Sequence, residues 1–321
     1  MARKRASTKG LALVAVGGNS LIRDNNHLSI PDQYDQATIT AHHIADMVEA
    51  GWNVIVTHGN GPQMGFVLQR SEISIHEVSP IPMDYAGADI QGAIGYMFMK
   101  AFRNEFRRRG IKREPIAVVT QTLVDSDDPA FKDPSKPIGS HFDEALAKKL
   151  AAQQGWVVKD DAGRGWRRVV ASPVPKKIID YRAIASLARG GYLVIGCGGG
   201  GIPVIEDKDG NITGVEAVID KDLASSLLAR TIGADLFMVS TGVERVAINF
   251  NKPNQRWLDR ITVSEAKRYC AEGQFDRGSM GPKIQALVEF LEAGGKHGLV
   301  TDPPNIGRAL AGKTGTQVVP G

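Results

Sequence analysis

Short apolar runs alternate with stretches of helical periodicity along most of the chain. Residues 11–16 form an uninterrupted apolar run, which is typical of a buried strand. Residues 31–50 carry apolar side chains at helical spacing and end at Gly51, so they predict a helix. Further strands are predicted at 53–57, 116–121, 192–196, 202–206, 215–219, 236–240, 297–301 and 316–319, and further helices at 84–109, 143–154, 176–189 and 263–273 and from 221 and 282 onward. This alternation predicts a mainly parallel sheet with helices on both faces.

Residues 125–172 interrupt this alternation. Residues 125–141 are polar and rich in proline, and they carry Lys136 next to Pro137. A loop of that length in a compact domain is usually a lid, a binding loop or a linker. A short helix and a hairpin over 156–170 follow, with the turn near 161–163. We therefore expect a small subdomain that leaves the main sheet.

The junction between the predicted strand at 215–219 and the following helix concentrates charge. Asp220 is a good N-cap, and Lys221 and Asp222 stand where α/β folds place their ligands. A lysine beside an aspartate can neutralise phosphate charge while the carboxylate fixes the lysine. The alternative is an exposed ion pair at a helix start.

Three glycine-rich turns follow predicted strands, at 17–20, 59–61 and 196–201. Their backbone N–H groups can approach an anion closely, although each turn taken alone also fits a plain tight turn. His58 precedes the second turn and is a candidate base, but a lone histidine beside a turn is more often structural.

Two familiar patterns lack the structural context they need. Residues 307–314 match the Walker A pattern, but residues 308–311 are helical in character and only seven residues follow Thr314. Gly196, Gly198 and Gly201 fit GxGxxG, yet an extended, proline-bearing segment follows where a dinucleotide site needs a helix. We therefore expect neither a P-loop nor a Rossmann site.

Composition narrows the class of protein. The 321 residues have a net charge of +4, with 42% hydrophobic and 23% charged residues, as in ordinary globular proteins. The basic residues are dispersed, so an acidic small molecule fits better than nucleic acid. Two cysteines without a CxxC pair indicate a reducing, cytoplasmic setting, and no apolar run is long enough to span a membrane. Residues 1–9 are expected to form a disordered basic tail before a single domain at 10–321.

The residues alone favour a kinase without a P-loop. Phosphoryl transfer requires in-line positioning and positive charge, which backbone amides, lysines and Mg²⁺ supply. Lys136, Lys221 and Lys283 stand in suitable settings, at the proline-rich loop, the strand–helix junction and a helix start. The chain contains no GxSxG nucleophile elbow and no HExxH pattern.

At this point the chain resembles the carbamate kinases of the amino-acid kinase superfamily, over about residues 11–319. The resemblance is carried, in order, by segments 16–19, 57–63, 136–139, 161–165, 172–173, 198–204, 219–222 and 278–283. The last three of these segments separate carbamate kinases from other superfamily members.

The resemblance implies an α/β fold, an open αβα sandwich with a mainly parallel central sheet and a small protruding lid subdomain at about 125–172. It also implies a homodimer that catalyses ATP + carbamate ⇌ ADP + carbamoyl phosphate with Mg²⁺ held mainly by the nucleotide. The N-terminal half would hold the carbamoyl phosphate end, and residues from about 190 onward would hold the nucleotide. The implied catalytic residues are Lys136, Lys221, Asp222 and Lys283, the substrate-binding residues Gly17, Gly18, Asn19, Gly59 and Asn60, and the nucleotide-binding residues Lys221, Asp222, Thr241, Asn249, Met280 and Lys283.

Two departures from the family pattern leave alternatives open. Family members commonly have Asp-Val-Cys at residues 84–86 and Gly-Pro-Phe-Tyr at 139–142, where this chain has Asp-Tyr-Ala and Gly-Ser-His-Phe. A kinase of the same superfamily that acts on an amino-acid carboxylate or UMP is one alternative. A non-catalytic sensor of carbamoyl phosphate or nucleotide is another, although a sensor has no need of charge arranged for a transition state.

Overall fold

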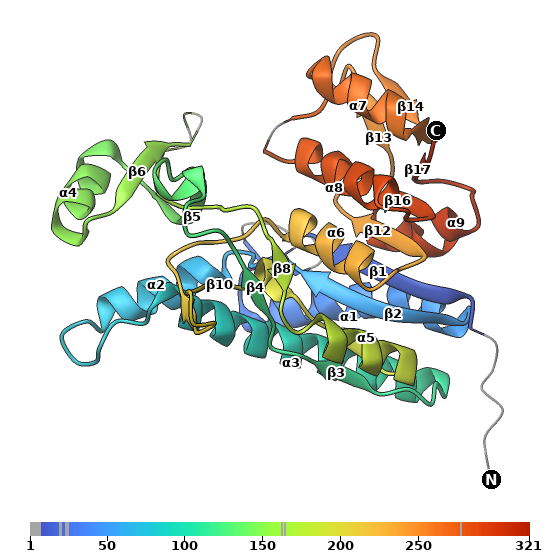
Figure 1. Ribbon diagram of the computed structural model, residues 1–321, viewed down its shortest axis with the longest axis horizontal. Helices are drawn as coiled ribbons and strands as arrows, with labels where there is room; N and C mark the ends of the chain where they lie inside the picture. The colour runs from blue at the N-terminus through green and yellow to red at the C-terminus, as the bar shows by residue number, and fades with distance from the viewer. Residues whose placement is uncertain (1–7, 19–20, 23–25, 162, 164, 277) are drawn as a thin grey trace.

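The computed structural model describes residues 8–18, 21–22, 26–161, 163, 165–276 and 278–321, and Ser140 without its side chain. Within these residues a central sheet lies between two layers of helices (Figure 1). Its strand order is β15-β17-β16-β12-β1-β2-β9-β3, and only β16 and β17 pair antiparallel. The strands are β1 (Gly10–Val16), β2 (Trp52–His58), β3 (Pro115–Ala117), β9 (Leu193–Ile195), β12 (Leu236–Ser240), β15 (Arg260–Thr262), β16 (His297–Thr301) and β17 (Thr316–Val319). The mainly parallel α/β fold predicted from the sequence is confirmed.

Strand β1 shows why the sheet must be covered on both faces. Leu11, Leu13 and Ala15 belong to one buried apolar cluster, and the residues between them belong to the other. The second cluster is covered by α1 (Ile30–Glu49), α2 (Gln63–Ile73), α3 (Met83–Arg109) and α9 (Ile306–Leu310). The first is covered by α5 (Tyr181–Gly190), α6 (Lys221–Thr231), α7 (Val263–Ala271) and α8 (Met280–Glu292). A parallel sheet buried on both faces gives the continuous apolar runs seen in the sequence.

A small subdomain, which we call the lid, stands apart from this sandwich (Figure 1). It consists of β5 (Lys136–Phe142), α4 (Glu144–Gln154), β6 (Val157–Asp160) and β7 (Trp166–Val170), with strand order β5-β7-β6. It lies close to α2, because a Cβ added to Gly65 would be 2.6 Å from the Cα of Gly139. The lid is therefore seated on the start of α2, beside the carboxyl end of β2.

Two smaller pairings complete the chain. A second sheet has the order β11-β10-β4-β8, and a hairpin joins β13 to β14. These strands are β4 (Gln121–Leu123), β8 (Lys177–Ile178), β10 (Ile202–Glu206), β11 (Ile212–Gly214), β13 (Val246–Ile248) and β14 (Arg256–Leu258), and the short 3-10 turns are η2 (Pro129–Phe131), η3 (Gly198–Gly200) and η4 (Pro303–Asn305). Both cysteines are free. In the part of the chain that the structure describes, no helix has the length and apolar character that crossing a membrane requires.

The strand predicted at 215–219 is wrong. Ala217 makes one isolated bridge to Ala171, and its N–H turns back to the carbonyl of Val215 at 2.9 Å. Backbone groups engaged locally cannot continue a ladder. The apolar run is nevertheless buried, since Val218 and Ile219 each contribute to one of the apolar clusters.

Three other predicted boundaries also differ. The single strand expected at 116–121 is divided into β3 and β4, which belong to different sheets, because Gln91 bonds the backbone of Thr120 between them. Lys136 opens strand β5, whereas the sequence predicted a loop. The helix predicted from residue 176 begins at Tyr181, after β8. The helical character of residues 308–310 and the strand after Gly201 confirm that neither glycine motif has the required context.

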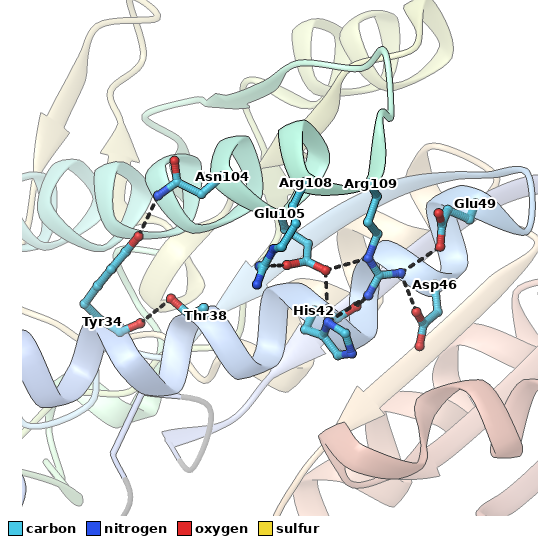
Figure 2. Close-up of polar contacts among 9 residues, drawn as sticks. All are labelled: Tyr34, Thr38, His42, Asp46, Glu49, Asn104, Glu105, Arg108 and Arg109. Carbon is cyan, nitrogen blue, oxygen red and sulfur yellow. Dashed lines mark hydrogen bonds and ion pairs between the residues drawn. The ribbon is translucent and has the colours of Figure 1, made fainter.

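Helices α1 and α3 are joined by a polar network (Figure 2). Its centre is Glu105, whose side chain is 2% exposed and accepts from Arg108 and Arg109. The Arg109 guanidinium also contacts Asp46 at 2.6 Å and Glu49 at 2.7 Å. These contacts attach the last turn of α3 to α1.

Candidate active site

The start of α6 fixes the charged junction. Asp220 caps the helix, and its Oδ1 accepts from the backbone N–H groups of Asp222 at 2.9 Å and Leu223 at 3.4 Å. Its other oxygen accepts from Lys136 Nζ at 2.9 Å. A residue distant in sequence therefore brings the lid strand to the first turn of α6.

Asp222 lies in that first turn and is 3% exposed. Its Oδ1 is 2.5 Å from Lys221 Nζ, and its Oδ2 is 3.1 Å from Lys283 Nζ. Burial opposes the charged carboxylate, but the two lysines outweigh it and hold the pKa of Asp222 below its usual range. Because both oxygens are occupied, the carboxylate positions two ammonium groups from different helices.

A cavity of about 450 Å³ contains these groups. Lys136, Lys221, Asp222 and Lys283, the residues predicted as catalytic, all line it. The remaining lining comes from the turn after β2, the start of α2, the lid strands and the segment before α6, at residues 59–62, 64–65, 137–139, 167, 199, 218–220 and 278. The structure thus brings together four charged residues that are separated by up to 147 positions in the chain (283 − 136).

Of the two glycine turns predicted to bind substrate, only one lines the cavity. Gly59 and Asn60 line the cavity, and a Cβ added at Gly59 would contact Lys221 Cδ at 3.4 Å. Gly17 and Gly18 follow β1 at the same edge of the sheet but do not line it, and Asn19 lies outside the described residues. The third glycine turn supports the second, because Gly199 leaves room for the Asn60 side chain.

His58 is placed as a structural residue. Its side chain is 1% exposed, its Nδ1 donates to the Gly59 carbonyl at 2.9 Å, and it does not line the cavity. Burial lowers the pKa of His58 to about 4, and the backbone bond to Gly59 only partly opposes this. The imidazole is therefore neutral near pH 7, packed against Gly198 and Phe98.

A second cavity of about 410 Å³ adjoins the start of α8. Asn249 and Met280, predicted to bind nucleotide, line it, whereas Thr241 lies at the end of β12 and lines neither cavity. Sequence reasoning missed Phe250, Trp257 and Phe275, which give this cavity its aromatic lining. The hairpin β13–β14, which carries Trp257, was not predicted from the sequence, and its strands are only three residues long.

The first cavity is suited to anions and offers little to a metal. Among the described residues, no three His, Cys, Asp or Glu side chains form a cluster that could hold a metal ion. The carboxylates of Asp220 and Asp222 are already bound to lysines. Any Mg²⁺ in this cavity would need its ligands from a phosphate-bearing molecule and water.

The fold and this site define a class of protein that comparison with known families identifies. The model of the Amino acid kinase family matches residues 10–302. The chain therefore belongs to the amino acid kinase family and is a phosphotransferase.

Relatives within that class narrow the assignment. The carbamate kinase of Thermococcus kodakarensis is 48% identical over 310 residues, covering 96% of this chain and 98% of the relative. The carbamate kinase-like protein YahI of Escherichia coli is 46% identical, covering 97% of this chain and 99% of the relative. The structure of carbamate kinase from Giardia lamblia bound to AMP-PNP has a TM-score of 0.91 at 40% identity, covering 97% and 99% of the two chains. Within the superfamily the chain belongs with the carbamate kinases, and the resemblance drawn from the sequence is confirmed.

Proposed function

We propose that this chain catalyses the reversible reaction ATP + carbamate ⇌ ADP + carbamoyl phosphate. The observation that carries the proposal is the pair of lysines fixed by one buried carboxylate, with a third lysine reaching the same helix start from the lid. This arrangement concentrates positive charge in a cavity of about 450 Å³. Its groups are preorganised where charge on a phosphoryl group in transfer would develop.

In the forward direction a carbamate oxygen attacks the γ-phosphorus of ATP, and the bond to the β–γ bridging oxygen breaks. The electron pair of that bond leaves with ADP. Lys221 from α6 and Lys136 from the lid would neutralise the transferred group, and the ion pair of Asp222 with Lys221 supports a positioning role for the carboxylate. No side chain has to form a covalent intermediate.

The nucleotide is assigned to the C-terminal half. Trp257 and Phe250 offer apolar faces to the base in the second cavity, where Asn249 and Met280 also lie. Lys283 is one turn into α8, in the first cavity, so its ammonium can contact the nucleotide phosphates. Thr241 follows β12 and lines neither cavity, so its nucleotide-binding role rests on the family resemblance alone. Mg²⁺ is assigned to the nucleotide phosphates, where it supplies charge neutralisation when bound.

The lining of the first cavity argues against an amino-acid substrate. An amino acid brings an ammonium group that needs a carboxylate partner. The lining carboxylates, Asp220 and Asp222, are both committed to lysines, and the other described lining residues carry no carboxylate. The departures at 84–86 and at His141 lie outside the lining, so they do not enlarge or acidify it.

The test is ATP formation from ADP, Mg²⁺ and carbamoyl phosphate, with Lys221→Ala as the blank. Rapid ATP formation that requires Mg²⁺ and that the variant lacks would support the proposal. Nucleotide binding without ATP formation would point to another small substrate of the same superfamily, to be found by screening carboxylates and UMP. ATP formation in this assay would exclude a non-catalytic sensor, whereas binding without turnover of any screened substrate would support one.

The homodimer and the cytoplasmic location remain predictions. Tyr85 and Tyr96 on α3 are 64% and 65% exposed, which supports an interface on that helix. Analytical ultracentrifugation of the whole chain would test the dimer, and a single species of monomer mass would contradict it.

A further inference from the structure

Two consecutive arginines on lid strand β7 face different cavities. Arg167 lines the 450 Å³ cavity, whereas Arg168 lines a separate cavity of about 250 Å³ between the lid and α2. There Arg168 pairs with Glu216 at 3.4 Å and Glu72 at 3.9 Å. Successive side chains of a strand point to opposite faces, so the lid directs one arginine into the site and uses the next to attach itself to the body.

A bulge in strand β5, which pairs with β7, lies opposite Arg167. Ile138 pairs with Arg168 and Phe142 with Trp166, so three residues of β5 oppose the single residue 167 of β7. Within the bulge, Gly139 has a φ of 69° and its carbonyl accepts from Arg167 Nη2 at 2.9 Å. Bulges re-aim side chains in this way beside functional sites.

The guanidinium of Arg167 has partners for some of its donors and lacks a partner for another. Arg167 Nη1 is 3.3 Å from Asp161 Oδ2, which also contacts His141 Nε2 at 2.9 Å. Arg167 Nε is buried and has no hydrogen-bond partner among the described residues. An arginine carries five N–H donors, and a buried donor without a partner is costly. The Arg167 side chain as a whole is 21% exposed and lines a cavity with three lysines, so an anion in that cavity can reach donors of the guanidinium other than Nε.

We propose that Arg167 is a further substrate-binding residue, whose free guanidinium donors contact the phosphoryl end of carbamoyl phosphate from the lid. The inference rests on the proposed function for the identity of the substrate, but not for the class of ligand, which is a phosphate anion. Arg167 lines the cavity from the lid strands together with Lys136 and Gly139, whereas Lys283, assigned to the nucleotide phosphates, comes from α8. It should therefore bind the acyl phosphate and leave ADP binding unchanged.

The experiment compares Arg167→Gln with Lys159→Gln. Both variants remove one positive charge from the lid, but Lys159 is exposed and pairs with Asp133 at 2.7 Å, outside the cavity. Two quantities are measured for each protein: the KM for carbamoyl phosphate at saturating ADP, and the dissociation constant of inorganic phosphate by calorimetry. ADP affinity is measured alongside them.

We expect Arg167→Gln to raise the KM and the phosphate dissociation constant about tenfold or more, with ADP affinity unchanged, since a charge-assisted hydrogen bond is lost. Lys159→Gln should leave all three quantities unchanged. If the wild-type chain binds phosphate but forms no ATP, the reaction proposed above fails, and loss of phosphate binding in Arg167→Gln still upholds this inference. Unchanged phosphate binding in Arg167→Gln, an equal effect of Lys159→Gln, or no phosphate binding by the wild type would overturn it.

Discussion

Two buried carboxylates in this molecule are each held by two cations, and they serve different ends. Asp222 binds Lys221 and Lys283, and all three line the cavity. Glu105 binds Arg108 and Arg109 between α1 and α3, and none of these three residues lines that cavity (Figure 2). The local chemistry is almost the same, so burial and ion pairing alone do not mark a functional site.

The difference lies in what surrounds the cations. Arg109 is surrounded by acceptors, since its guanidinium also donates to Asp46, to Glu49 and to the carbonyl of His42. Burial opposes the charge of Arg109, but Asp46 and Glu49 together outweigh it and raise the pKa of Arg109. Lys221 and Lys283 instead have ammonium groups that line an open cavity. We call the Glu105, Arg108 and Arg109 network the clamp. The clamp pairs Arg109 with acceptors of the protein itself, whereas a binding site keeps donors for a ligand.

The largest expected effect is on the clamp. Glu105→Ala should lower the free energy of unfolding by about 4 kcal/mol, because it removes the buried acceptor at the centre of the network and leaves Arg109 Nε without its carboxylate partner, and should leave kcat unchanged. Equilibrium urea unfolding measures the first quantity and the ATP-forming assay the second. As a matched control, Glu49→Ala removes an exposed partner of Arg109 and should cost under about 1 kcal/mol. Equal costs for the two variants would show that the network does not centre on Glu105.

A second prediction concerns His58, a buried titratable residue beside the cavity that does not line it. Burial lowers its pKa from 6.5 to about 4, so the unfolded chain binds more protons between these values. Its contribution to stability is complete above pH 6.5 and is lost as the pH falls toward about 4. The shift corresponds to about 3 kcal/mol.

The measurement is the difference in unfolding free energy between about pH 7 and about pH 4 for wild type, His58→Gln and His58→Asn. Both variants are neutral at all pH values, so both should lose about 3 kcal/mol less than wild type, whatever their absolute stability. Groups such as Asp222 titrate equally in all three proteins and cancel. A pH dependence in the variants identical to that of wild type would show that folding does not lower the pKa of His58.

Lys221→Ala is expected to lower the rate of phosphoryl transfer. It removes one preorganised positive charge from the cavity, so kcat should fall at least about a hundredfold. Lys283 still binds Asp222, so the fold should persist, which circular dichroism would check. The initial rate of ATP formation decides the matter, and a loss below about threefold would remove Lys221 from its assigned role.

The sequence predicts the sheet better than it predicts the site. Buried strands such as β1 and β12 carry continuous apolar runs, so their pattern leaves little choice. The charged junction was recognisable because Asp220 caps a helix within its own sequence neighbourhood. The contact of Lys136 with Asp220 spans 84 positions and has no local signature. The strand predicted before that junction is absent. Its apolar residues are buried because they pack into the two apolar clusters, and not because they pair with a neighbouring strand.

Arg167 shows the same limit. Neither of two adjacent arginines could be assigned to a face until the pairing of β5 with β7 fixed the register. A shift of one residue would exchange their positions. The aromatic lining of the second cavity was missed for a related reason, since Phe250, Trp257 and Phe275 come from a loop, a short strand and a turn that no periodic pattern connects.

The smallest expected effect separates the two members of the Glu105 pair. Arg108 is 62% exposed and contacts Glu105 from the following turn, whereas Arg109 is 14% exposed and has several acceptors. Arg108→Ala leaves Glu105 bound to Arg109, so it should cost under about 1 kcal/mol and leave kcat unchanged. Urea unfolding would detect the cost, and added salt should reduce it, because salt screens exposed charges. A loss comparable to that of Glu105→Ala would mean that the exposed arginine holds the clamp together. The contrast between enclosed and open cations would then no longer explain why one network stabilises the fold and the other is available to a ligand.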